Sequence, residues 1–296
     1  MVEEYMTRQF TFESDRLIAL AGIASVYQRL TEIPEESYLA GLWRHTFLQD
    51  LLWVTREGSR VCPPQLYRAP TWSWASMEPR DQTDRFSWGY VEATPSGADI
   101  NPNHLVATVK AVEVETPGSR FGLVSSAHIV LQSYLIKACL STEIKNVPSY
   151  FTDEQVAEFF TGGRREYAVN TLALFADDDL TTFPPEAMSV EDSLESLMKP
   201  VLDDTLLPFS IPKKMAVYLA IIECFLDHAK RGDGHALVLV KGSQKGEYRR
   251  IGYVRLKQKV MYPWTTHGHF GAFEALDPSE YLQKGAEAGS YAYRVV

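Results

Sequence analysis

Cysteine is scarce in this sequence, and long apolar runs are missing. Three cysteines, Cys62, Cys139 and Cys224, lie far apart and form no CxxC pair, so neither a disulfide framework nor a zinc knuckle is expected. The most apolar run, residues 215–226, is shorter than the roughly 20 residues of a membrane-spanning helix. The N-terminus carries acidic residues in place of the basic residues of a secretory signal. We therefore predict a cytoplasmic protein without a membrane partner.

Basic residues are in the minority. The chain has 29 lysines and arginines against 38 aspartates and glutamates, which gives a formal net charge of −9. A nucleic-acid partner is normally met by a clustered basic surface, and pairs such as Arg164-Arg165 and Arg249-Arg250 are too small to supply one. The charge balance therefore predicts no nucleic-acid partner.

Motifs that hold cofactors or activate nucleophiles are missing as well. GxGxxG, GxxxxGK[ST] and GxSxG do not occur, which removes the usual signals for a dinucleotide, a P-loop and an esterase-type serine. His267 and His269 could bind a metal ion, but no third ligand is spaced to complete a site. We predict that the protein uses neither a cofactor nor a metal.

Helical periodicity is concentrated near the N-terminus. Apolar residues recur at intervals of three and four over residues 14–30, and a second set lines one face of residues 35–53. The two segments are predicted to form an antiparallel pair of helices. A further short helix is predicted over residues 152–160, where Thr152 and Gln155 are placed for a capping box.

Strand-like alternation dominates after residue 65. Apolar residues alternate with period two in the runs 104–115, 126–140, 166–175, 214–226, 235–241 and 247–258. The glycine-rich segment between the last two runs is predicted to form a hairpin. Because helices do not alternate with the strands, the predicted fold class is mainly β (α+β). The expected architecture is an antiparallel β-barrel or sandwich with an N-terminal helical pair and a few short helices.

The same patterns predict a single domain over residues 1–296. Its helical segment (1–60) is expected to pack on a β unit (65–265). Residues 176–213, rich in proline, serine and acidic residues, are predicted to form a long excursion, and residues 274–296 a C-terminal tail.

Several short blocks give the sequence a recognisable order. They are SDRLIALAGIA (14–24), YLAGLW (38–43), LLWV (51–54), YRAPTWSWAS (67–76), the FG turn at 121–122 and YRRIGYVRL (248–256). In this order they resemble the region that follows the HET domain in fungal heterokaryon-incompatibility proteins, from about residue 10 to about residue 264. The HET domain itself, a TIR-like α/β module linked to cell death, is not in this sequence. The resemblance implies an interaction or regulatory module and supplies no catalytic residue.

The aromatic residues leave two structural roles open. Trp72 and Trp74, which would point to one face of a strand, can fill the gap between the sheet and the N-terminal helices, or they can line a cavity. Barrels of about eight strands can hold one small ligand. The residues predicted to bind a substrate are Trp72, Trp74, Trp88, Tyr90, Tyr253 and Trp264, and the predicted catalytic donors are His267, His269 and Arg249.

Two functions are therefore weighed. The first is a cofactor-independent cyclase or pericyclase of fungal secondary metabolism, which would hold a hydrophobic polyketide or terpenoid in its barrel. Such an enzyme needs no classical catalytic site, because orientation of the reactants alone can supply roughly 7–11 kcal/mol. The alternative is a non-catalytic interaction module related to heterokaryon incompatibility. We predict the enzyme, and a closed barrel filled by its own side chains would favour the module.

Overall fold

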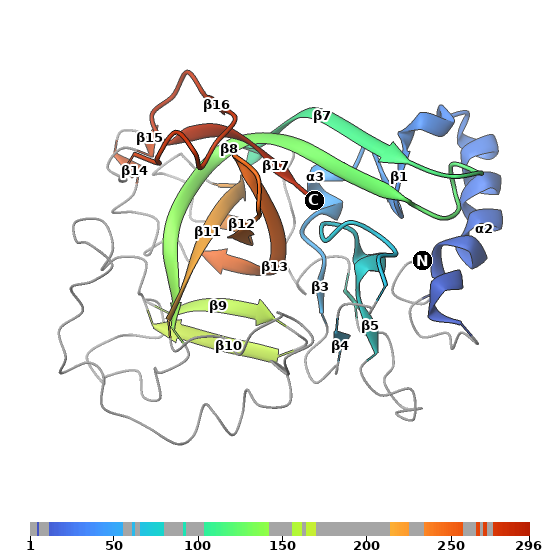
Figure 1. The fold of residues 1–296 in the computed structure, drawn as a ribbon, viewed down its shortest axis with the longest axis horizontal. Helices are drawn as coiled ribbons and strands as arrows, with labels where there is room; N and C mark the ends of the chain where they lie inside the picture. Colours follow the sequence, from blue (N-terminus) through green and yellow to red (C-terminus); the bar gives the residue numbers. More distant parts are fainter. Residues whose placement is uncertain are drawn as a thin grey trace.

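A computed structural model of the chain describes residues 5, 12–55, 61–62, 66–79, 91–92, 104–141, 156–161, 164–169, 214–224, 234–256, 265–266, 269–270 and 275–296. Within this part the fold is mainly β, as predicted (Figure 1). The long excursion predicted over residues 176–213 lies outside the described residues.

Five strands close into a barrel. They are β8 (Ser126–Ser141), β11 (Lys214–Glu223), β12 (Gly234–Lys241), β13 (Glu247–Leu256) and β17 (Ser290–Val295), and each pairs with the next in this order. β17 closes the ring by pairing with both β13 and β8. A closed ring with an odd number of strands cannot alternate direction throughout, so one neighbouring pair must be parallel. That pair is β13–β17, whereas the other four pairs are antiparallel.

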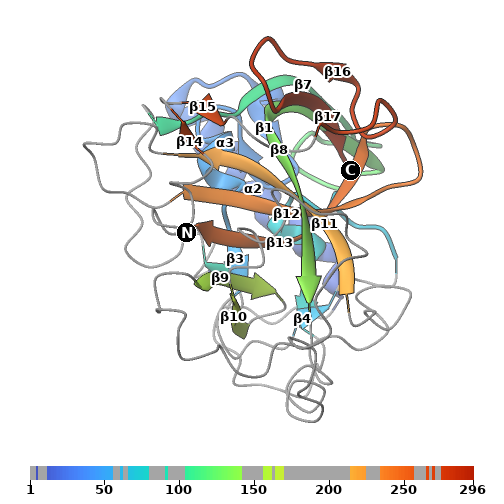
Figure 2. The same cartoon turned by 90° about the vertical axis from the view of Figure 1, so that its left-hand side faces the viewer.

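Further strands extend the barrel sheet. β7 (Thr108–Glu115) pairs with β8, and β16 (Gln283–Lys284) pairs with β17. β9 (Val156–Thr161) pairs with β13, and β10 (Arg164–Val169) pairs with β9, which continues the sheet below the barrel in both ribbon views (Figures 1 and 2). Each of the six predicted strand runs therefore overlaps a strand, although residues 170–175, 225–226 and 257–258 of these runs lie outside the described residues.

The N-terminal layer holds the main helix of the described chain. It consists of η1 (Glu13–Asp15), α2 (Arg16–Thr31), η2 (Glu35–Ser37), β1 (Tyr38–Leu39), β2 (Leu42–Trp43) and α3 (Phe47–Asp50). The first predicted helix is confirmed as α2. The second, over residues 35–53, is wrong, because the chain forms a 3-10 turn, a β1–β2 hairpin and a single helical turn there. The hairpin turns through Ala40 and Gly41, both at positive φ, a backbone conformation that no helix accommodates.

Short elements complete the described chain. They are β3 (Val54–Thr55) with β6 (Val91–Glu92), β4 (Val61–Cys62) with β5 (Glu78–Pro79), β14 (Thr265–Thr266) with β15 (His269–Phe270), and the 3-10 turn η3 (Trp74–Ser76). The strand expected to carry Trp72 and Trp74 is therefore wrong. Ser73 caps η3 by accepting a hydrogen bond from the backbone N–H of Ala75, which favours the turn over an extended chain.

Two more expectations need correction. Residues 152–160 were expected to be helical, but residues from Val156 onward form β9, whose pairing with β13 outweighs the local helical signal. Residues 274–296 were expected to form a tail outside the β unit, but they supply β17, a wall of the barrel. The β sheet consequently extends well past residue 265.

The central part of the sheet, in β11 and β12, is covered on both of its faces. All residues of 217–224 and 234–239 are buried, so neither side of these parts of β11 and β12 meets solvent. Tyr248 on β13 packs its ring 4.9 Å from the ring of Tyr218 on β11, a strand that is not its neighbour. Rings from non-adjacent strands can meet in this way on the concave side of a closed barrel. Side chains of the strands thus occupy this part of the barrel interior.

Candidate functional site

Three titratable residues from consecutive strands come together at one end of the barrel. Glu223 is the last residue of β11 and lies directly opposite His235, the second residue of β12. Tyr253 on β13 pairs with Leu237, two residues further along β12, so its side chain shares a face with that of His235. A β-bulge between Ile221 and Glu223 sets the register that brings the carboxylate to the imidazole.

These three residues form a buried relay, which we call the Glu223–His235–Tyr253 relay. The Nδ1 atom of His235 is hydrogen-bonded to the hydroxyl of Tyr253, and its Nε2 atom lies 3.6 Å from Oε2 of Glu223. The side chains are almost inaccessible, with relative exposures of 1% for Glu223, 5% for His235 and 0% for Tyr253. A proton on Nε2, the nitrogen that faces the carboxylate, would make Nδ1 the acceptor for the phenol proton.

Arg250 places a positive charge next to this relay. Its guanidinium is buried against the Trp53 ring at 3.7 Å from the ring centroid, and it donates to the carbonyl oxygens of Leu51, Trp53 and Gly252. Burial lowers the pKa of Arg250 to about 9, while the interaction with Tyr253 opposes that shift. The two side chains are therefore electrostatically coupled, and a negative charge on the phenol oxygen would be stabilised by the guanidinium.

Cys224 follows the relay carboxylate in the chain, and its backbone N–H donates to the carbonyl of His104 at 3.0 Å. Burial, and to a lesser degree Glu223, raises the pKa of the Cys224 thiol to about 12. The thiol is therefore protonated at neutral pH and is not a ready nucleophile.

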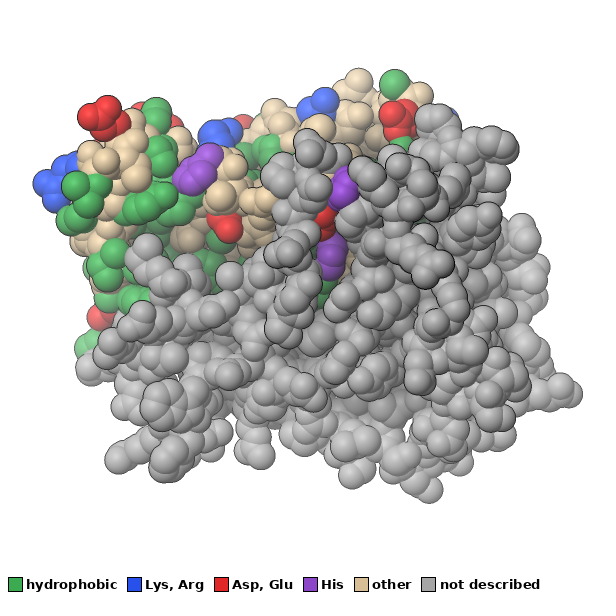
Figure 3. Space-filling view, turned by 180° about the vertical axis from the view of Figure 1, so that it is seen from behind, with side chains coloured by type: hydrophobic (Ala, Val, Ile, Leu, Met, Phe, Trp, Pro, Cys, Tyr) green, Lys and Arg blue, Asp and Glu red, His purple; other side chains and the backbone are tan. Residues whose placement is uncertain are grey.

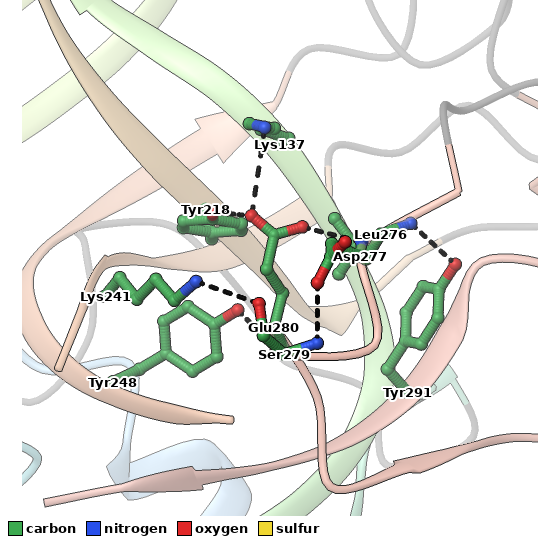
Figure 4. Close-up of polar contacts among 9 residues, drawn as sticks. All are labelled: Lys137, Tyr218, Lys241, Tyr248, Leu276, Asp277, Ser279, Glu280 and Tyr291. Carbon is green, nitrogen blue, oxygen red and sulfur yellow. Dashed lines mark hydrogen bonds and ion pairs between the residues drawn. The ribbon is translucent and has the colours of Figure 1, made fainter. Parts of the chain in front are cut away.

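A second polar cluster lies around Glu280 (Figure 4), next to Tyr218 in the middle of β11 and Tyr248 near the start of β13. The buried Glu280 carboxylate accepts hydrogen bonds from the Tyr218 hydroxyl and, at 2.9 Å, from the backbone N–H of Asp277. Its backbone carbonyl accepts from the Tyr248 hydroxyl at 2.6 Å, and Lys137 Nζ lies 3.8 Å from the carboxylate. We call these residues the Glu280 anchor.

The Glu280 anchor has a structural role. Burial, reinforced by Glu280, raises the pKa of both Tyr218 and Tyr248, so both phenols stay protonated and act as donors. Their hydroxyls bond the turn around Glu280 to β11 and β13. The backbone N–H of Leu276 also donates to the Tyr291 hydroxyl of β17 at 3.2 Å. The anchor therefore holds the segment that leads into β17 and hence the closure of the barrel.

The two predicted tryptophans of the WSWAS block are placed in the core. Trp72 and Trp74 are fully buried, and Trp72 packs edge-on against Phe47 with ring centroids 5.4 Å apart. The indole N–H of Trp74 donates to the carbonyl of Gly41 at 2.9 Å, and Ser73 Oγ donates to Ala40 at 2.6 Å. The block holds the β1–β2 hairpin in place, so the two tryptophans are part of the core.

The remaining predicted site residues differ in where the structure places them. Tyr253 belongs to the relay. Arg249 is exposed, and the buried arginine is its neighbour Arg250, because successive residues of a strand face opposite sides. His269 lies in β15, but its side chain is outside the described residues, as are Trp88, Tyr90, Trp264 and His267 altogether.

Sequence reasoning missed Glu223, His235 and Glu280. Glu223 lies near the end of the predicted strand run 214–226, and His235 begins the run 235–241. Polar residues close to the facing ends of two successive strands are the signal that was available. Glu280 sits in a segment that gave no periodic signal, and only the tertiary contact with Tyr218 shows its role.

Comparison with protein-family models, with curated proteins and with solved structures finds no match for this chain. No helix in the described part of the chain is long and apolar enough to cross a bilayer. Among the side chains that the structure describes, no group of three or more histidine, cysteine, aspartate or glutamate residues is arranged to hold a metal ion.

Proposed function

We propose that this protein is a non-catalytic interaction module that binds a helix of another polypeptide through the outer side of α2. The observation that carries the proposal is that α2 bears an exposed apolar row in addition to its buried one. Leu17, Leu20 and Ala24, spaced by three and four residues, are buried against the protein. An apolar patch left exposed beside a buried face often marks an interaction site.

The outer side of α2 bears a second apolar row. Ile23, Val26 and Leu30, spaced by three and four residues, have relative exposures of 50%, 44% and 80%. Figure 3 shows hydrophobic side chains gathered on the part of the surface that α2 forms. With Ala19, which is also exposed, this row has the 3-4 spacing of a helix-pairing seam. We call these four residues the α2 seam.

The α2 seam is complementary to a second copy of itself. In an antiparallel pair centred between Ile23 and Val26, these two residues face each other across the interface, and the small Ala19 faces the large Leu30. Alternation of small and large residues is what close helix packing requires. A symmetric pair of this kind uses the same surface on both partners. A second copy is therefore the partner we propose.

The buried aromatic residues also support an interaction module. Trp72 and Trp74 hold the N-terminal layer together, and tyrosine side chains of β11 and β13 fill part of a barrel with five strands, fewer than the roughly eight that enclose a small ligand. The resemblance to the region after the HET domain favours the same class of function. Cyclisation of a hydrophobic substrate stays the competing proposal, and the relay is the described feature that favours chemistry.

The test measures the molar mass of the purified protein in solution over a range of concentrations. We expect a dimer in the unchanged protein and a monomer in the double variant Ile23→Glu, Leu30→Glu, because carboxylates in the seam would be buried without partners. Thr108→Glu, which adds a charge at an exposed site of β7, is the control and should stay dimeric. A monomer at every concentration, or a double variant that stays dimeric, would contradict the proposal.

A further inference from the structure

Two aromatic side chains lie beside the α2 seam. Tyr27 follows Val26 in α2 and lies about 40° round the helix from Ile23, so it borders the seam on one side. Its ring packs against that of Trp43 in β2, with centroids 5.0 Å apart and planes 55° apart. Both side chains are half-buried, so each leaves part of its ring at the surface. We call Tyr27 and Trp43 the aromatic pair.

The Trp43 ring is held in place by its own molecule. The ring of Tyr38 meets it edge-on, with centroids 5.1 Å apart, and the ring of Phe121 lies 6.5 Å away. Tyr38 and Phe121 are themselves buried, so they support the tryptophan from the inside. A side chain whose orientation is fixed in this way loses little conformational freedom when a partner binds.

The α2 seam needs a larger apolar surface around it. A stable protein interface commonly buries about 1,600 Å² in total and uses about 20–30 residues a side, whereas the seam has four. The contact must therefore extend beyond α2, and the aromatic pair continues the apolar surface of the seam onto β2. Arg44 and His45, which follow Trp43, are exposed and supply polar residues at its edge. An aromatic centre with a polar rim is the usual composition of an interface.

Antiparallel pairing of α2 brings the aromatic pairs of two copies towards each other. The two-fold axis passes between Ile23 and Val26, so Tyr27 lies about 4 Å from the axis along the helix, at a rise of about 1.5 Å per residue. An axis that relates two antiparallel helices keeps the same flank of each helix on the same side of the dimer. Both aromatic pairs therefore lie on one side of the dimer and close to its centre.

We propose that the aromatic pairs of two copies pack together across the two-fold axis, with Trp43 as the residue that contributes most to the affinity. This inference rests on the α2 dimer proposed above and identifies the part of the surface that dominates it. Tryptophan and tyrosine near the centre of an interface are the residues that most often carry its binding energy. Burial of the exposed parts of four rings, two from each copy, adds apolar area to that of the seam.

Hydroxyl-radical footprinting, read by peptide mass spectrometry, measures the exposure of single side chains in the unchanged protein. Labelling is done well below and well above the concentration at which half of the protein is dimeric. We expect oxidation of Trp43 and Tyr27 to decrease by about threefold or more in the dimer, because residues at the centre of an interface are shielded from water. Oxidation of Tyr67, an exposed tyrosine outside the seam and the aromatic pair, should stay the same.

A substitution measures the contribution of the tryptophan. Trp43→Ala should increase the Kd of the dimer by about 30-fold or more, the effect of truncating a residue that dominates an interface. Leu66→Ala is the matched control, since it also shortens an exposed apolar side chain, and it should change the Kd by less than about threefold. Circular dichroism shows whether Trp43→Ala folds. If it does not, footprinting of the unchanged protein decides.

The outcomes distinguish this inference from the α2 dimer itself. A dimer in which Trp43 is oxidised as fast as in the monomer would overturn the role of the aromatic pair and leave the α2 seam in place. A folded Trp43→Ala variant that dimerises as tightly as the unchanged protein would do the same. A protein that is monomeric at every concentration would overturn both proposals.

Discussion

At the scale of single residues, the contact between Gly41 and Trp74 connects the N-terminal layer with the WSWAS block. Gly41 has a φ of +96°, a conformation that favours glycine, and a side chain there would meet the Trp74 indole at 3.0 Å. The carbonyl of Gly41 also accepts the indole hydrogen bond. Gly41 thus determines both the turn of the hairpin and the position of the fully buried Trp74.

Gly41→Ala should destabilise the protein by about 2–4 kcal/mol, because it adds backbone strain and a clash with a packed ring. The measurement is the free energy of unfolding in denaturant. Gly22→Ala is the matched control, since a side chain at Gly22, within α2, would have no atom within 4 Å. That change should stabilise the protein by about 0.5–1 kcal/mol. Equal effects of the two substitutions would contradict the role given to Gly41.

At the scale of elements, the Glu280 anchor shows how a segment without regular structure can hold a strand. Lys137 is partly exposed and lies 3.8 Å from the carboxylate, so its ion pair contributes little. The buried hydrogen bonds from Tyr218 and from the backbone of Asp277 contribute more, because losing their acceptor leaves buried donors unpaired.

Glu280→Ala should therefore cost about 2–4 kcal/mol, the sum of about 1–3 kcal/mol for each donor left without an acceptor, reduced where water can enter. Lys137→Met should cost less than about 1 kcal/mol. Denaturant unfolding followed by tyrosine and tryptophan fluorescence gives both values. A cost for Lys137→Met as large as that for Glu280→Ala would show that the ion pair, and not the hydrogen bonds, secures the turn.

The elements also show what a sequence can and cannot reveal here. The helix α2 and the strand runs follow from local periodicity, and the structure confirms them. The failure at residues 35–53 has a physical cause, because the apolar residues there serve a hairpin that packs under Trp74, a contact between residues 33 positions apart. The relay could not be foreseen in the same way. It depends on the register of three strands and on a bulge, neither of which is written in the period of any one strand.

At the scale of the whole molecule, buried phenols are a recurring feature of the described core. Burial is the main cause that raises the pKa of Tyr38, Tyr134, Tyr218, Tyr248 and Tyr293 above the ordinary value of 10.0. In the folded protein these tyrosines keep their protons at a pH where the unfolded chain loses them. The folded state then binds more protons than the unfolded state, so stability decreases as the pH increases.

We therefore expect the free energy of unfolding to be steady up to about pH 9 and to decrease steeply above about pH 10. Buried Cys224, with its pKa raised to about 12, acts in the same direction. Arg250 acts in the opposite direction, because its pKa is lowered to about 9 in the folded protein, but it is one group against five tyrosines. Urea unfolding at several alkaline pH values gives the slope. A midpoint that stays constant or increases up to about pH 11 would contradict this account.

The strand that closes the barrel, β17, comes last in the chain, and this has a consequence for biosynthesis. The strand that seals the ring, Ser290–Val295, bonds to a β8 partner about 160 positions earlier, as the Ser133–Tyr293 contact shows. During translation the edges of β8 and β13 that pair with β17 therefore stay unpaired until residue 295 has left the ribosome. Nascent chains of this protein should depend on chaperones that shield unpaired strand edges, and a messenger truncated even slightly before this strand would yield a product that cannot close its ring.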